Sequence, residues 1–184
     1  MPNWAWGTFR VTGRQEAVEA FAERLLTEDT VPAVPGVRHF ARTFSGRTRS
    51  ALREEIRAVF AGLPPGAEAV CCLDADFAWS AEQCLLDGYP QRAPEECISL
   101  SEACRADGVD AELWTKEPLG SFEEHIRCTR RGYVRASWQE LQEVWCRRCG
   151  AVAARASFEA LDDLFCGECG ASDFDVEPPR EEDP

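Results

Sequence analysis

The amino-acid sequence predicts an α+β protein, with a ferredoxin-like sheet that has helices packed on one face, followed by a small C-terminal zinc ribbon. Two patterns predict the sheet and its helices: some segments alternate apolar and polar residues as strands do, and segments between them place apolar residues at the helical period. The 184 residues suffice for one ordinary core and a small accessory module. Two copies of Cys-x-x-Cys-Gly predict the ribbon.

The first strand is predicted at residues 4–13, "WAWGTFRVTG", and an amphipathic helix follows it. One face of the strand would carry Ala5, Phe9 and Val11, and the other Trp4, Trp6 and Thr8. Thr12 and Gln15 have the spacing of a capping box. The apolar face of the helix consists of Val18, Phe21, Ala22, Leu25 and Leu26. Trp4 and Trp6 are expected to be covered by another element, with an exposed binding surface as the alternative.

The next segment combines a weaker strand pattern at residues 37–44 with a second helix that stops at "GLPPG". The apolar face of this helix consists of Leu52, Ile56, Val59, Phe60 and Leu63. Between Arg38 and Arg57 there are six arginines against Glu54 and Glu55. This basic island is the place in the chain where cations could gather on one binding face.

The third strand, "AEAVCCLDADFAW" at residues 67–79, alternates regularly. Its inward face would carry Ala69, Cys71, Leu73, Ala75, Phe77 and Trp79, and the pairs Asp74/Asp76 and Glu123/Glu124 are interpreted as solvated. Ser80 with Gln83 and Ser99 with Glu102 predict two further helix starts, and Gly108 predicts a helix end. A final hairpin turns at "KEPLGS". Its inward residues are Val109, Ala111, Leu113, Phe122, Ile126 and Cys128.

The opening "MPNWAWGTFRVTG" with its following helix, together with "VDAELWTKEPLGSFEEHI", resembles the YubB-type ferredoxin-like domain of phage and plasmid proteins. The resemblance covers about residues 1–135. It implies a fold and a mobile-element origin. It implies no activity, because a fold alone does not determine one.

Cys146, Cys149, Cys166 and Cys169 form the pattern C-x2-C-x16-C-x2-C, which is typical of a four-cysteine zinc site. Gly150 and Gly170 follow the two pairs, where a sharp turn needs a residue that tolerates positive φ. Four thiolates complete a tetrahedral shell and leave no position for water or substrate. We therefore predict one structural Zn²⁺ in a ribbon at residues 136–172, in preference to a redox pair of cysteines.

The other six cysteines are interpreted as buried thiols, since strand alternation places His125 and Cys128 on opposite faces where they cannot share an ion. Neither His39 nor His125 belongs to a recognisable catalytic motif, so we expect a protein that is not an enzyme. Ten cysteines without a secretory leader or an apolar span favour a cytoplasmic protein with no membrane segment.

The net charge of −13 disfavours generic nucleic-acid binding, and the tail at residues 173–184 is acidic and expected to be disordered. The preferred interpretation is a protein-binding adaptor or modulator that uses the ribbon as its docking knob. Arg147 and Arg148 at the first knuckle would meet a carboxylate-rich partner. The alternatives are an acidic inhibitor that imitates nucleic acid, a ribbon that binds nucleic acid, and an enzyme whose site lacks a sequence motif. The oligomeric state stays open.

Overall fold

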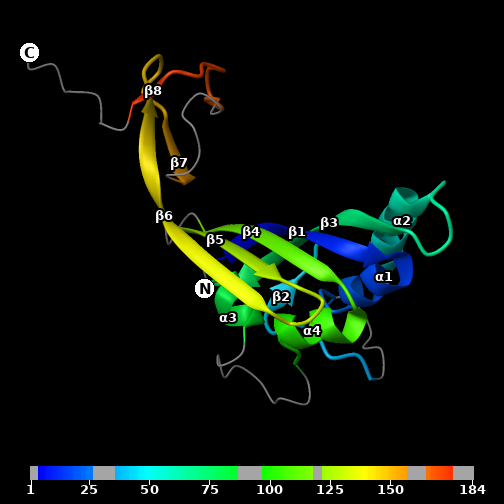
Figure 1. The fold of residues 1–184 in the computed structure, drawn as a ribbon. Helices are drawn as coiled ribbons and strands as arrows, with labels where there is room; N and C mark the ends of the chain where they lie inside the picture. Colours follow the sequence, from blue (N-terminus) through cyan, green and yellow to red (C-terminus); the bar gives the residue numbers. More distant parts are fainter. Residues whose placement is uncertain (1–3, 27–35, 87–96, 118–121, 157–164, 176–184) are drawn as a thin grey trace, which may run out of the picture.

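The computed structural model describes residues 4–26, 36–86, 97–117, 122–156 and 165–175. It confirms the α+β class: the strands pair antiparallel in the order β2-β3-β1-β4-β5-β6-β7, with β8 paired to β6 (Figure 1). The strands are β1 (Trp4–Arg14), β2 (Thr43–Phe44), β3 (Glu68–Ala78), β4 (Asp110–Glu117), β5 (Phe122–Cys128), β6 (Val134–Cys146), β7 (Val152–Ala156) and β8 (Phe174–Asp175). The helices are α1 (Gln15–Glu23), α2 (Arg49–Phe60), α3 (Ala81–Leu85) and α4 (Leu100–Asp107).

The main core lies between the helices and one face of the sheet, as the sequence predicts. Its centre is a group of aromatic rings. The ring centre of Phe9 in β1 is 5.4 Å from that of Phe21 in α1 and 6.0 Å from that of Phe77 in β3. Trp4 and Trp6 lie on the opposite face and are 41% and 51% exposed. The expectation that another element covers them is therefore wrong for the described residues, because the helices all pack against the other side.

The predicted helix starts are confirmed at α3 and α4. The Ser80 hydroxyl accepts the amide of Gln83 at α3, and Ser99 with Glu102 forms a complete capping box at α4. Gly108 ends α4 with φ of 72°, as predicted. The capping box at Thr12 is wrong: β1 continues to Arg14, so Thr12 is still paired in the sheet and Arg14 precedes α1 without a side-chain cap.

Three predictions about strands and apolar faces need correction. Of residues 37–44, Thr43 and Phe44 form β2, and His39 makes a single bridge to Cys97. Trp79 leaves the inward face of β3 because the strand ends at Ala78 and Trp79 has a positive φ of 79°, which turns its exposed ring toward Arg42. Of the predicted apolar face of the second helix, Leu52, Ile56 and Phe60 of α2 are buried, whereas Val59 of α2 and Leu63, which lies beyond the end of α2, are exposed.

The hairpin of β4 and β5 follows the predicted register of faces, with Leu113 opposite Ile126 in the core. Lys116 and Glu117 of the predicted turn belong to β4, and residues 118–121 lie outside the described part. The interpretation of Glu124 as solvated is wrong, because it is buried on the inward face. Its carboxylate accepts the amides of Ala81 and Glu82 and the hydroxyl of Thr115, which compensates for its burial.

β6 connects the main sheet to the cysteine pairs. It begins at Val134, beside the predicted domain boundary at residue 135, and continues to Cys146. Residues 134–140 pair with β5, and residues 141–146 pair with β7 or β8. Within the predicted acidic tail, Phe174 and Asp175 form β8, and residues 176–184 lie outside the described part. None of the described helices is both long enough and apolar enough to cross a membrane.

Candidate metal centre

The four predicted ligands come together at the far end of β6. The sulfur atoms of Cys146, Cys149, Cys166 and Cys169 all lie within 4.8 Å of one another. The Sγ atoms of Cys146 and Cys169 are 3.6 Å apart, and those of Cys149 and Cys166 are 3.5 Å apart. Each close contact joins a cysteine of the first pair to one of the second. The two pairs are therefore interleaved around one point, where they can bind one metal ion.

The backbone repeats the same geometry in both knuckles. The amide of Gly150 donates to the carbonyl of Cys146 at 2.8 Å, and the amide of Gly170 donates to the carbonyl of Cys166 at the same distance. The φ angles of the two glycines are 72° and 70°. A Cβ added at either glycine would meet no atom within 4 Å. Glycine is thus favoured here by the left-handed backbone and not by lack of space.

The close approach of the four sulfurs affects their pKa values in opposite directions. Burial raises the pKa of Cys146, but the amides of Cys149 and Arg148 donate to its sulfur, and the pKa falls from 9.0 to about 7. The amide of Ala151 donates to the sulfur of Cys149 and lowers its pKa. The neighbouring thiols, of which Cys166 has the largest effect, outweigh this and raise the pKa of Cys149 to about 12. Four sulfurs this close cannot all lose their protons unless a cation lies among them. The electrostatics therefore favour a bound metal ion.

A small apolar cluster packs around two of the cysteines. Val144 of β6 and Phe174 of β8 are buried with Cys146 and Cys166, separately from the main core. The amide of Cys146 donates to the carbonyl of Ala151, and that of Cys166 donates to the carbonyl of Ala171. Among the described residues, Val144 and Phe174 are the large apolar side chains buried in this cluster, and burial of two such side chains gives little stability. A metal ion bound by the four cysteines would add stability that this cluster alone does not supply.

The remaining cysteines and the histidines do not extend the site. None of the ten cysteines forms a disulfide, and Cys71, Cys84, Cys104 and Cys128 are buried as predicted, whereas Cys72 is exposed and Cys97 partly so. Burial raises the pKa of Cys71 to about 11 and that of Cys84 to about 12, which makes both thiols unreactive. Among the described residues, the four ribbon cysteines are the only set of three or more potential ligands close enough to share an ion.

His125 lies on the outward face of β5, as predicted, and Cys128 lies on the inward one. The imidazole stacks on Trp114 with the ring centres 4.8 Å apart, and its Nε2 is 2.9 Å from Oε1 of Glu112. Trp114 was not singled out from the sequence, although its alternation with the buried Leu113 and Thr115 could have placed it on the outward face. It lies between two charged pairs that join β4 to β5.

The basic island does not form a free cationic face. Arg49 and Arg53 both pair with Glu23, at 2.7 and 2.9 Å. The other ion pairs are Arg38–Glu102, Arg47–Glu55 and Arg57–Glu19. The sixth arginine, Arg42, lies over the ring of Trp79 at 5.0 Å. All six arginines are thus engaged within the chain.

The first knuckle is also partly neutralised. Arg147 lies 3.2 Å from Asp175 and 3.6 Å from Asp173. Arg147 thus has carboxylates within the chain, and a carboxylate-rich partner would compete with Asp173 and Asp175 for it. Arg148 is exposed, and the described residues offer it no ion pair. Comparisons of the chain with protein-family models, curated proteins and solved structures find no match.

Proposed function

We propose that this chain is a non-enzymatic zinc protein whose ribbon serves as a docking module for another protein. One Zn²⁺ would be bound by Cys146, Cys149, Cys166 and Cys169. The observation that carries the proposal is the interleaving of the two cysteine pairs within 4.8 Å.

The distances support zinc and a structural role. A tetrahedral shell with Zn–S bonds of about 2.3 Å has sulfur–sulfur edges of about 3.8 Å. The closest pairs of sulfurs are 3.5 and 3.6 Å apart, so the sulfurs need to move only slightly to bind the ion. Four thiolates select zinc or iron over the harder cations. A shell that four cysteines close has no position for a substrate, so the ion would hold the fold and not activate water.

Exposed apolar side chains support docking of a protein. Phe165, directly before the second knuckle, is 70% exposed, and Val152 in β7 is 57% exposed. Apolar anchors next to a rigid turn are typical of protein interfaces. The surrounding charges favour a protein over a nucleic acid, since Arg147 pairs with two aspartates and the basic island is internally paired.

The metal is tested first. Elemental analysis of protein purified with reductant should find one zinc per chain and little iron. Well under one equivalent of zinc, or iron in its place, would contradict the metal assignment.

Docking is then tested by affinity capture from a cell extract with the wild type, Phe165→Ala and Glu168→Ala. Glu168 is exposed in the same knuckle, so its variant is the matched control. A partner retained by the wild type and the Glu168 variant, but lost with Phe165→Ala at full zinc content, supports docking through the ribbon. An identical set of captured proteins in all three samples would contradict it.

A further inference from the structure

The face of the sheet opposite the helices, here called the open face, consists of three rows of outward side chains across β1, β4, β5 and β6. The first row is Trp6, Lys116, Glu123 and Gln139. The second row is Thr8, Trp114, His125 and Ser137. The third row is Arg10, Glu112, Arg127 and Arg135. None of the described helices covers this face (Figure 1).

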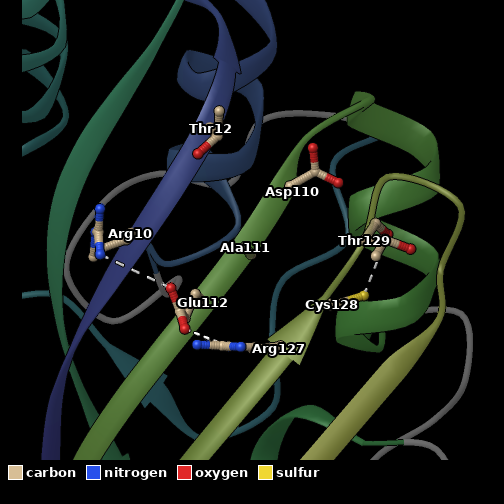
Figure 2. Close-up of a pocket in the computed structure, with 8 residues that line it drawn as sticks. All are labelled: Arg10, Thr12, Asp110, Ala111, Glu112, Arg127, Cys128 and Thr129. Carbon is tan, nitrogen blue, oxygen red and sulfur yellow. Dashed lines mark hydrogen bonds and ion pairs between the residues drawn. The ribbon is translucent and has the colours of Figure 1, made fainter.

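The first and third rows carry opposite polarity on the same two strands. In the first row the cation is on β4 and the carboxylate on β5, with Lys116 Nζ 2.7 Å from Glu123 Oε1. In the third row the carboxylate is on β4, where Glu112 pairs with Arg127 of β5. Figure 2 shows Arg10, Glu112 and Arg127 side by side on β1, β4 and β5. The pattern on the open face is therefore complementary to itself when it is reversed along the strands.

We propose that the open face binds a second copy of this chain in a twofold-symmetric dimer. The twofold axis lies between the two sheets, perpendicular to the strands and parallel to the second row. Rotation about this axis places each strand over the same strand of the second copy, and it places the first row of one copy over the third row of the other. Lys116 then faces Glu112 of the second copy, and Glu123 faces the second copy's Arg127. Trp6 faces Arg10, a cation–π arrangement. By symmetry, each of these contacts occurs twice.

Two hollows on the open face lie where the twofold rotation places long side chains of the second copy. One hollow of about 240 Å³ is lined by Glu123, Trp114, His125 and Gln139 among others, and the 62% exposed side chain of Arg127 in the second copy stands over it. The other hollow, of about 260 Å³, is lined by Glu112, Asp110 and Arg10 among others (Figure 2). In the proposed dimer it receives Lys116 of the second copy. Sheets that pack face to face lie about 10 Å apart with strands within about 30°. Lysine and arginine side chains can bridge that gap.

The second row decides whether like charges meet on the axis. Thr8, Trp114 and Ser137 carry no charge, and the fourth member, His125, is stacked on Trp114 with its Nε2 2.9 Å from Oε1 of Glu112, so a carboxylate lies beside the one titratable side chain on the axis. Asp74 of β3 continues this row beyond Thr8, to which it is hydrogen-bonded at 2.8 Å, and would approach its own symmetry mate. We therefore centre the contact on β4 and β5, with β3 at its margin. A nucleic acid fits the face less well, because Glu123 and Glu112 lie beside its cations and repel phosphate.

The dimer is tested by sedimentation equilibrium of the full chain at about 150 mM salt, an ionic strength at which surface charges still interact over about 8 Å. The wild type should have twice the chain mass of 20.5 kDa. Lys116→Glu and Glu112→Lys should each weaken self-association at least tenfold, because each places like charges across the axis. A one-to-one mixture of the two variants should associate again, since every reversed charge then meets an opposite one.

The mixture is the decisive sample, because a variant damaged within its own sheet cannot be repaired by another chain. Glu54→Lys on the exposed side of α2 is the matched control and should remain dimeric. Asp74→Asn should tighten the dimer. A Cys166→Ser variant should also remain dimeric, which separates this inference from the proposed function of the ribbon. A monomeric wild type at 100 µM, or two folded monomeric variants that fail to associate when mixed, would overturn the proposal.

Discussion

The carboxylate of Glu124 on β5 accepts the backbone amide of Ala81, the first residue of α3, at 2.7 Å. Its other oxygen accepts the amide of Glu82 at 3.1 Å. The first amides of a helix have no partner within the helix, so Glu124 caps α3 from a neighbouring strand. This side chain therefore links the start of α3 to β5.

Glu124→Gln should lower the free energy of unfolding by about 1–3 kcal/mol, because an amide cannot accept at both positions. Burial raises the pKa of Glu124 above 4.5, despite the donors that lower it. The folded state therefore binds the proton more tightly, and this carboxyl's contribution to stability falls as the pH rises from its ordinary pKa through the raised one. Denaturant titrations at several pH values measure both effects. The difference in the free energy of unfolding between the wild type and Glu124→Gln should fall as the pH rises through this range. The control variant Glu54→Gln should keep the pH dependence of the wild type.

Gly150→Ala should destabilise the ribbon by about 1 kcal/mol, because the residue has a left-handed backbone that alanine adopts poorly. Gly167→Ala is the matched control, since Gly167 has equal space around it and no positive φ. A chelator should remove zinc faster from the Gly150 variant than from the wild type and the control. Equal rates for the two variants would show that the knuckle geometry does not limit metal retention.

Patterns local in sequence predicted the parts of this fold that depend on local forces. The alternation in β3 and the capping box at Ser99 are short-range and confirmed, and the two matched Cys-x-x-Cys-Gly motifs correctly indicated that four sulfurs come together. The long strand β6 is largely polar over residues 135–143, so its alternation was weak, and its pairing with β5 and β7 supplies the missing signal.

The pairing of charges could not be predicted where the partners are distant in sequence. The arginines from Arg38 to Arg57 outnumber the acids among them, but Glu19, Glu23 and Glu102 reach them from α1 and α4. A count of charges along a segment does not include such partners. Glu124 had a usable signal, since it shares the inward parity of Ile126 and Cys128. It was missed because a buried carboxylate requires donors from another element, which here are the amides of α3.

Replacing Cys166 by serine should abolish stoichiometric zinc binding and unfold the ribbon while β1–β5 stay folded. The two apolar clusters share no residue, so the main core does not depend on the ribbon cluster. Zinc binding supplies about 10–16 kcal/mol of apparent folding free energy in small zinc modules, far more than the ribbon can obtain by burial. Hydrogen exchange should show loss of protection in residues 141–156 and retention in β1 and β3. Loss throughout the chain would mean that β6 couples the two parts into one folding unit.

The chain should not bind nucleic acid at about 150 mM salt. Such binding depends on lysines and arginines that neutralise phosphates, and the basic island is already paired with carboxylates. Titration of labelled single- and double-stranded DNA and of RNA measures this. Glu23→Gln releases Arg49 and Arg53 and should produce weak binding at about 50 mM salt that disappears near 150 mM, whereas Glu54→Gln should not. Micromolar binding by the wild type at the higher salt, weakened when Arg147 and Arg148 become alanine, would show that the ribbon recognises phosphate after all.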